Sequence, residues 1–223
     1  MLTIKTGNIF STESEYIVNT VNCFGVMGAG IALEFKLRYP KMFEKYKEFS
    51  DKKEIEIGKL WIYDKEDKNI LSFPTKNHWR FPSKIEYIER GLQKFVDNYQ
   101  AKKISSIAFP LLGVGKGGLQ ETDVLNLMDL YLEPIDIDIE IWKFKPLQDY
   151  EFESFRQFVL NLSDNYKSKS IPKRTINLFK ETLEINKHIN LSSLKQVKGI
   201  SENRIQELFQ EYKKIKYEPT LFD

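Results

Sequence analysis

The chain has 223 residues, with 34 Lys and Arg against 32 Asp and Glu, and a formal net charge of +2. With 41% hydrophobic and 13% aromatic residues it can bury a sizeable core, which excludes a disordered chain. No run of eighteen apolar residues occurs, which excludes a membrane span, and the single cysteine, Cys23, excludes an internal disulfide and a multi-cysteine zinc site. The chain starts with strand-like alternation rather than a signal peptide, so we expect a cytoplasmic protein. No metal ion is expected.

The first two thirds of the sequence alternate strand and helix patterns. Strands are predicted over residues 2–6, 16–21, 59–63, 69–73, 106–110 and 135–144, and helices over residues 29–38, 42–49, 85–99 and 122–132. Strands separated by helices predict an α/β domain whose sheet is largely parallel. In such sheets ligands bind beside the carboxyl ends of the strands. The loops after Val21, Phe73 and Phe109 should therefore converge there.

Strand patterns are absent from the sequence after about residue 150. Helices are predicted over residues 152–163, 175–187, 191–197 and 202–214, and the polar stretch 163–174, which contains Pro172, is a candidate linker. From Asp164 onward the chain has twelve Lys and Arg against eight Asp and Glu. Residues 194–205 (LKQVKGISENRI) resemble a helix-hairpin-helix turn with Ser201 in place of a second glycine. We interpret them as a packing extension capped at Ser201, although the basic balance leaves DNA contact open.

Two glycine-rich loops each follow a buried strand and precede a helix. The first is residues 19–32 (NTVNCFGVMGAGIA) and the second is residues 109–119 (FPLLGVGKGGL). Glycines let backbone amides approach an anion, and the following helix offers unpaired N–H groups and the positive end of its dipole. Two such loops across one crevice predict a diphosphate ligand. Neither loop is a P-loop, which argues against ATP hydrolysis.

A third loop, residues 73–80 (FPTKNHWR), follows another predicted strand. Lys76 at a strand's carboxyl end is able to pair with phosphate or, if its pKa is lowered, to act as a nucleophile. His78 by itself is explained by a solvated basic turn. Trp79 either stacks on a base or forms a wall of the core. Cys23 is expected to pack as a small hydrophobic residue.

At these three loops the sequence resembles the macrodomains, most closely the DarG type, antitoxins that remove ADP-ribose from thymidine in DNA. The matching stretches are residues 6–9, 18–22 with 25–32, 73–80 and 110–119, and the likeness covers about residues 1–145. It implies a three-layer α/β/α sandwich with a mixed, mostly parallel sheet over residues 1–148. The remainder, residues 149–223, is then a helical C-terminal extension.

The same resemblance assigns roles to individual residues. Lys76 becomes the catalytic lysine, with Asn22 beside the distal ribose as its partner, and Asn8 and Ile9 flank the adenine. The full set of expected ligand-binding residues is Asn8, Ile9, Asn19, Thr20, Gly28, Ala29, Gly30, Ile31, Thr75, Leu112, Gly113, Val114, Gly115, Lys116 and Gly117. No cofactor is expected, since ADP-ribose is itself the ligand and product.

The implied reaction is hydrolysis of the N-glycosyl bond between the distal ribose and thymine. Lys76 either attacks the anomeric carbon or only orients the sugar. A lysine near its usual pKa of about 10.4 is protonated at neutral pH, so attack requires a lowered pKa. The relative that acts on glutamate-linked ADP-ribose has an aspartate in the second glycine loop, where this chain has Gly115-Lys116-Gly117-Gly118. That difference favours DNA over protein as the substrate.

The resemblance therefore predicts a DNA ADP-ribosyl glycohydrolase, the antitoxin of a toxin–antitoxin pair, with a function in DNA repair. Its expected partners are ADP-ribosylated single-stranded DNA and a DarT-type toxin, without a membrane. Two alternatives stay open: a reader or toxin-binding protein that binds ADP-ribose without turnover, and a hydrolase of glutamate-linked ADP-ribose.

Overall fold

The computed structural model describes residues 1–64, 67–145, 149–163, 165–168, 170–186 and 189–217. The chain divides into two compact units, Met1–Leu147 and Gln148–Asp223. The expected boundary after residue 148, the end of the helix predicted over 175–187, and parts of the candidate linker lie outside the described residues.

The first unit is built on one six-stranded sheet in the order β1-β6-β5-β2-β4-β3. Its strands are β1 (Leu2–Gly7), β2 (Tyr16–Asn22), β3 (Trp61–Tyr63), β4 (Asn69–Lys76), β5 (Ser106–Pro110) and β6 (Asp138–Phe144). Only the β3–β4 pair is antiparallel; the β1–β6, β6–β5, β5–β2 and β2–β4 pairs are parallel. This confirms the prediction of a mixed, mostly parallel sheet.

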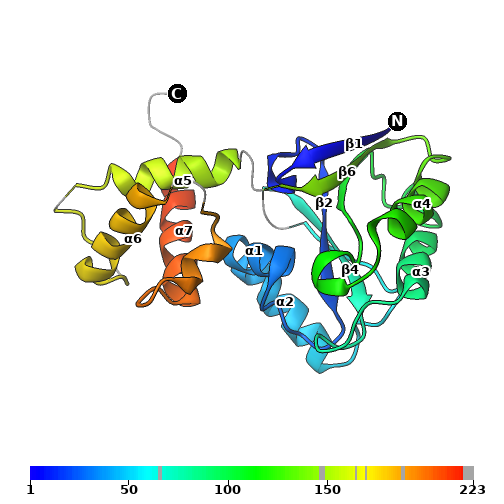
Figure 1. Cartoon of the computed structure of the whole chain (residues 1–223), viewed down its shortest axis with the longest axis horizontal. Helices are drawn as coiled ribbons and strands as arrows, with labels where there is room; N and C mark the ends of the chain where they lie inside the picture. The colour runs from blue at the N-terminus through cyan, green and yellow to red at the C-terminus, as the bar shows by residue number, and fades with distance from the viewer. Residues whose placement is uncertain (65–66, 146–148, 164, 169, 187–188, 218–223) are drawn as a thin grey trace. The chain divides into compact units, whose positions relative to one another are not determined.

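Helices cover both faces of this sheet (Figure 1). One face packs on α1 (Gly30–Arg38) and α2 (Pro40–Asp51), and the other on α3 (Ile85–Val96) and α4 (Glu121–Leu132). Successive strand residues alternate between the two cores, because side chains of a strand point alternately to opposite faces. Ile17 packs with the α1–α2 side, for example, whereas Val18 packs with the α3–α4 side. The predicted three-layer α/β/α sandwich is therefore confirmed.

Strand β4 is longer than the sequence predicts and runs on through Pro74 to Lys76. Pro74 lacks an N–H group, which normally keeps proline out of central strands. Here β3 pairs only with Ile70–Ser72, so β4 has a single neighbouring strand, β2, at Pro74. Lys76 is consequently the last residue of a strand rather than part of a free loop.

Helix α3 lies unusually close to β4 at one glycine. A Cβ atom added to Gly91 would lie 2.1 Å from Cζ of Phe73, a fully buried ring in the α3–α4 core. Only a residue without a side chain fits there. The close approach of Gly91 to Phe73 therefore sets how tightly α3 packs on the strand that ends in Lys76.

The second unit is helical, as predicted. It contains α5 (Tyr150–Leu160), α6 (Lys173–Ile185), a short 3-10 helix η3 (Ser192–Gln196) and α7 (Glu202–Tyr217). The ring of Phe155 on α5 lies 5.1 Å from that of Phe209 and 5.7 Å from that of Tyr212, both on α7. Phe179 of α6 is also fully buried, so this unit has an apolar core of its own.

The turn between η3 and α7 has the features expected of a capped helical connection. Gly199 has a φ of +99°, Ile200 is buried, and the Arg204 N–H donates to Ser201 Oγ at 3.4 Å. Ser201 thus caps α7, as predicted. No helix within the described ranges is long and apolar enough to cross a membrane.

Candidate functional site

Five of the six strands end at the same edge of the sheet, because they run parallel. Along this edge the order is β1, β6, β5, β2 and β4. Asn8 and Ile9 follow β1, the second glycine loop follows β5, the first glycine loop follows β2, and Lys76 ends β4. With strands about 4.8 Å apart, the two ends of this row are about 19 Å apart. The edge therefore suits an elongated ligand whose central part lies at the glycine loops.

The first glycine loop is organised by Asn22, the last residue of β2. Its Oδ1 accepts hydrogen bonds from the N–H groups of Phe24 (3.0 Å) and Val26 (3.3 Å), and its Nδ2 donates to the Val26 carbonyl at 2.5 Å. The side chain is buried, and it shapes the backbone on the way to Gly25, whose φ is +82°. Asn22 thus has the local geometry of a residue that positions the loop.

This loop ends in the first turn of α1. Gly28, Ala29 and Gly30 are exposed, Gly30 has a φ of +58°, and Ala29 at the helix N-cap offers no side-chain oxygen to the first-turn amides. No acidic side chain lies in the first turn either. The start of α1 is therefore electrostatically suited to an anion.

The second glycine loop contains a 3-10 turn, η2 (Gly115–Gly117). Gly113, Gly115 and Gly118 all have positive φ, at +71°, +61° and +83°, a region that other residues rarely adopt. Apart from the adjacent residues, no atom of the described residues lies within 4 Å of a Cβ built on Gly115 or Gly118, so these two positions face open space. Their backbone is accessible to a ligand without a side chain in between.

Lys76 lies directly beside Asn22 in the register of β2 and β4, next to a bulge between Val21 and Asn22. The Cys23 N–H donates to the Lys76 carbonyl at 2.9 Å, which holds the two strand ends together. The Lys76 amino group donates to the Lys116 carbonyl of the second glycine loop. Both predicted catalytic residues and both glycine loops thus meet at one place.

Partial burial lowers the pKa of the Lys76 amino group below its usual 10.5. Among the described residues no carboxylate lies within ion-pair distance to counteract this shift. Burial also raises the pKa of the neighbouring Cys23 thiol to about 11, so the thiol is protonated at neutral pH and packs against the α1–α2 core. Of these two side chains, Lys76 is the one whose pKa is shifted toward its nucleophilic form, the neutral amine.

Further contacts join the three loops. The Ser83 N–H donates to the Gly117 carbonyl at 2.9 Å, and a Cβ on Gly30 would lie 3.8 Å from Lys116 Cγ. The convergence expected after Val21, Phe73 and Phe109 is therefore confirmed. Ser83 has no distinctive sequence signal, and only its contact with Gly117 reveals its role.

The residues expected at the adenine end are buried at the end of β1. Asn8 Oδ1 accepts from the Phe10 N–H at 3.1 Å and caps the 3-10 turn η1 (Ile9–Ser11), and Ile9 joins the α1–α2 core. Their contact with an adenine stays a prediction. Their place at the far end of the row from Lys76 matches it.

Several other expected ligand-binding residues lie beneath the surface. Asn19 is fully buried with its Nδ2 3.9 Å from Met27 Sδ, Thr75 is buried with its hydroxyl 3.5 Å from the Val21 carbonyl, and Leu112 is in the α3–α4 core. Thr20, Ile31 and Val114 are half-buried. These side chains support the loops, and any ligand contact of Leu112 has to come from its backbone.

Two of the three loops carry positive charge, and none of the three carries negative charge. Residues 22–33, 74–85 and 110–120 contain Lys76, Arg80, Lys84 and Lys116 but no Asp or Glu. In the described part of the chain, no group of three or more His, Cys, Asp or Glu is arranged to hold a metal ion. The charge of the site favours an anionic ligand bound by backbone amides and cationic side chains.

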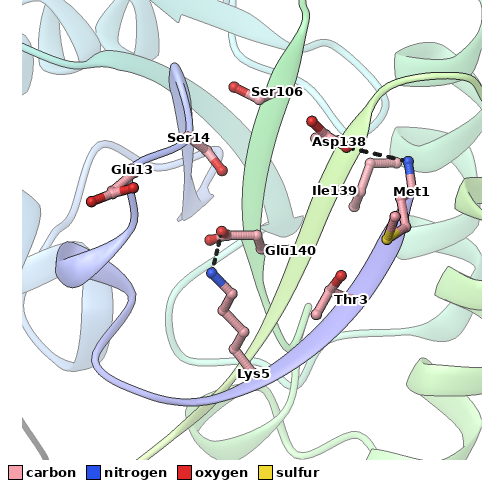
Figure 2. A pocket seen from close by; sticks show the side chains of 9 residues that line it. All are labelled: Met1, Thr3, Lys5, Glu13, Ser14, Ser106, Asp138, Ile139 and Glu140. Carbon is pink, nitrogen blue, oxygen red and sulfur yellow. Dashed lines mark hydrogen bonds and ion pairs between the residues drawn. The ribbon is translucent and has the colours of Figure 1, made fainter.

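A cavity of about 310 Å³ lies away from these loops, around residues that begin β1, β6 and β5 (Figure 2). Glu140 on β6 bonds Lys5 of β1 at 2.5 Å. Burial raises the pKa of the Glu140 carboxyl, but hydrogen bonds from Lys5, Thr12 and Trp142 outweigh it and leave the pKa low. Because Glu13, Asp138 and Glu140 all line this cavity, it is unsuited to a diphosphate.

Comparisons with known proteins relate this chain to the macrodomains. The family model described as "Macro domain" matches residues 18–128. A Mycobacterium tuberculosis protein named DNA ADP-ribosyl glycohydrolase is 44% identical over 147 residues, 64% of this chain and 42% of that protein. A Thermosipho africanus protein named DNA ADP-ribosyl transferase-DNA ADP-ribosyl glycohydrolase fusion protein is 35% identical over 160 residues, 63% of this chain and 41% of that protein. This chain therefore matches less than half the length of either relative.

A solved structure, the macrodomain of Mycobacterium tuberculosis DarG, superposes with a TM-score of 0.61 and 44% identity. The match covers 64% of this chain and 97% of that structure. The match thus takes in nearly the whole of a known macrodomain. On these grounds the chain belongs to the macrodomain family.

Proposed function

We propose that this chain is a DNA ADP-ribosyl glycohydrolase that removes ADP-ribose from thymidine. The observation that supports this most directly is Lys76, an amine of lowered pKa at the end of β4, joined to both glycine loops. Binding ADP-ribose requires the glycine loops but not a lysine of this kind. The names of the relatives with 44% and 35% identity support the same activity.

In this proposal the two glycine loops bind the diphosphate through backbone amides at Gly28–Ile31 and Gly113–Gly117. Asn8 and Ile9 lie at the adenine end, and the distal ribose lies beside Lys76. Asn22 positions the first loop, because its amide is bonded to the backbone of that loop. The ordering of these residues along the sheet edge supports this arrangement.

The bond to be broken joins the anomeric carbon of the distal ribose to a ring nitrogen of thymine. The Lys76 amine, when unprotonated, forms a bond to the anomeric carbon while the thymine leaves with the electron pair as an imide anion and takes up a proton. Opening of the sugar ring gives an imine, which water hydrolyses to free ADP-ribose and the amine. The lowered pKa of Lys76 is a shift in the direction that this route requires.

The DNA substrate is proposed to be single-stranded, since a ring nitrogen of thymine is accessible only outside a base-paired duplex. The fusion protein among the relatives supports a DarT-type transferase as the partner, which would make this chain its antitoxin. A role in DNA repair and a cytoplasmic location belong to the same proposal. The helical unit is a candidate contact surface for the toxin or for DNA.

Release of ADP-ribose from a single-stranded oligonucleotide with ADP-ribosylated thymidine tests the proposal. We expect the wild type to release ADP-ribose and Lys76→Ala to be slower by roughly 10²-fold or more. Calorimetry with free ADP-ribose should show that both proteins bind it. Lys102→Ala removes an exposed lysine remote from the three loops and should behave as wild type.

Three outcomes would contradict parts of the proposal. A wild type that binds ADP-ribose but releases none is a reader, not an enzyme. Full release by Lys76→Ala would leave the enzyme standing but remove Lys76 from the reaction. Faster release from a glutamate-linked peptide than from DNA would identify a protein substrate.

A further inference from the structure

Four aromatic side chains form a continuous cluster at the rim of the site. We call Phe24, His78, Trp79 and Phe81 the aromatic rim. The His78 ring is at its centre, with ring centroids 4.3 Å from Phe24, 5.7 Å from Trp79 in a stacked arrangement, and 5.4 Å from Phe81. The cluster joins two loops, since Phe24 follows β2 whereas the other three follow β4.

The aromatic rim is exposed despite its apolar character. Phe24 is 55% exposed, Trp79 42% and Phe81 65%. Within the described ranges ten large hydrophobic side chains are exposed, and three of them are these neighbours. Soluble proteins seldom gather exposed aromatic rings at one place without a ligand to cover them.

The aromatic rim lies next to the reactive amine. His78 is two residues after Lys76, and Phe24 is two residues after Asn22, the residue paired with Lys76 across β2 and β4. It is also at the Lys76 end of the row of loops, where the proposed function places the distal ribose and its attached base. A substrate that extends beyond its ADP-ribose must therefore pass close to the aromatic rim.

A cation accompanies the rings. The Arg80 guanidinium lies 4.8 Å from the centroid of the Trp79 ring, and the Arg80 N–H donates to His78 Nδ1 at 3.2 Å. No carboxylate of the described residues lies within ion-pair distance of Arg80, and the segment from residue 68 to residue 85 has no Asp or Glu. The charge of Arg80 is thus available to an anionic partner.

We propose that the aromatic rim and Arg80 form a strand-binding subsite for single-stranded DNA, which stacks the bases next to the modified thymidine and contacts a backbone phosphate. Exposed aromatic side chains together with a cation are the combination that binds unpaired bases and phosphates. An acidic peptide would satisfy Arg80 but would leave the ring faces without flat partners. A duplex offers phosphates but keeps its base faces stacked. The inference rests on the proposed function, and it explains residues that binding of ADP-ribose leaves unused.

The test compares two substrates on the full chain: ADP-ribosylated thymidine as a mononucleoside, and the same modified thymidine within a single-stranded decamer. For Trp79→Ala and Phe81→Ala we expect the ratio of kcat/KM for the decamer to that for the mononucleoside to fall about tenfold or more, mainly through a higher KM. Leu130→Ala, which removes a 70% exposed side chain of α4, is the matched control and should leave the ratio unchanged.

A second measurement does not depend on turnover. Fluorescence anisotropy with an unmodified single-stranded decamer should show binding by the wild type at low salt and about tenfold weaker binding by Trp79→Ala and Phe81→Ala. For Arg80→Gln, the negative slope of log affinity against log salt concentration should become less steep by about 0.7, the value for one phosphate contact to a single strand. Lys102→Gln removes a positive charge elsewhere on the same unit and should leave this slope unchanged.

The two proposals fail in different ways. If the wild type releases no ADP-ribose from either substrate but the anisotropy results hold, the proposed activity is wrong and the strand-binding subsite stands. The proposed subsite is wrong if Trp79→Ala and Phe81→Ala lower kcat/KM equally for the decamer and the mononucleoside. It is also wrong if these variants bind the unmodified decamer as tightly as Leu130→Ala does. Tighter binding of an ADP-ribosylated glutamate peptide than of the DNA decamer, lost in Trp79→Ala, would assign the aromatic rim to a peptide.

Discussion

Two roles are open to Lys76: its neutral amine attacks the anomeric carbon, or its ammonium form orients the sugar. The protonation state of the amino group decides between them. Its amino group is partly buried, and burial is the cause that lowers its pKa. Its hydrogen bond to the Lys116 carbonyl is with a neutral partner, and among the described residues no carboxylate is close enough to stabilise the ammonium form. A bound diphosphate would work in the opposite direction, since a nearby negative charge raises the pKa of a lysine.

The pH dependence of the reaction therefore distinguishes attack from orientation. If Lys76 attacks, only its neutral form reacts, so kcat/KM should rise with pH up to the lowered pKa and level off below pH 10.5. If Lys76 orients the sugar as an ammonium ion, kcat/KM should be flat and fall as the pH passes that pKa. Single-turnover rates on the modified decamer measure this, and trapping of an imine with borohydride should label the wild type but not Lys76→Arg.

The placement of Lys76 depends on elements that are remote from the chemistry. β4 is held between β2 and the short β3, and its Phe73 packs against α3 at Gly91. Helix α3 also supports the second glycine loop, because a Cβ on Gly113 would lie 3.1 Å from Cδ1 of Ile88 on this helix. A shift of α3 would therefore displace two of the three loops together.

Gly91→Ala tests this packing. Alanine is the better helix former by about 1 kcal/mol, but its Cβ would lie 2.1 Å from the Phe73 ring, and overpacking of this kind costs about 1–3 kcal/mol. We expect a net loss of up to about 2 kcal/mol in the free energy of unfolding, measured by urea denaturation. Combination with Phe73→Leu should cost less than the sum of the two single changes, because the smaller side chain makes room. Additive effects would show that Gly91 and Phe73 do not interact.

At the level of the whole chain, the site and the helical unit are separable. Every residue of the candidate site lies in the unit Met1–Leu147, which has its own two cores. The unit Gln148–Asp223 has an independent core around Phe155, Phe179 and Phe209. Binding of ADP-ribose should therefore not need the helical unit.

A chain that ends at Lys145 should bind ADP-ribose with a Kd within about threefold of the full chain, because its loops and cores are complete. Calorimetry measures the affinity, and circular dichroism confirms that the shortened chain is folded. Affinity for the modified decamer and for a DarT-type toxin, measured on both chains, then defines the role of the helices. A folded shortened chain that has lost ADP-ribose binding would show that the two units depend on each other.

Local patterns in the sequence were sufficient for much of this protein. Alternating strands and helices predicted the α/β class, because burial on both faces and the 3.6-residue helix period leave signals within a single element. The two glycine loops left a local signal as well, because backbone with positive φ strongly favours glycine, as at Gly113 and Gly115. Lys76 was predicted from its position directly after a strand and from the resemblance to the macrodomains. The helical character of the second unit and the cap at Ser201 belong to the same class of local signal.

Only the tertiary structure decided the features that depend on residues distant in the chain. The extension of β4 through Pro74 depends on β3 being short, and the roles of Ser83 and Gly91 depend on contacts with Gly117 and Phe73. The aromatic rim is of this kind as well, because Phe24 and His78 are separated by 53 intervening residues and meet only when β2 and β4 pair. Sequence patterns record what one element needs, whereas the partners of a side chain are determined by the packing of elements on one another.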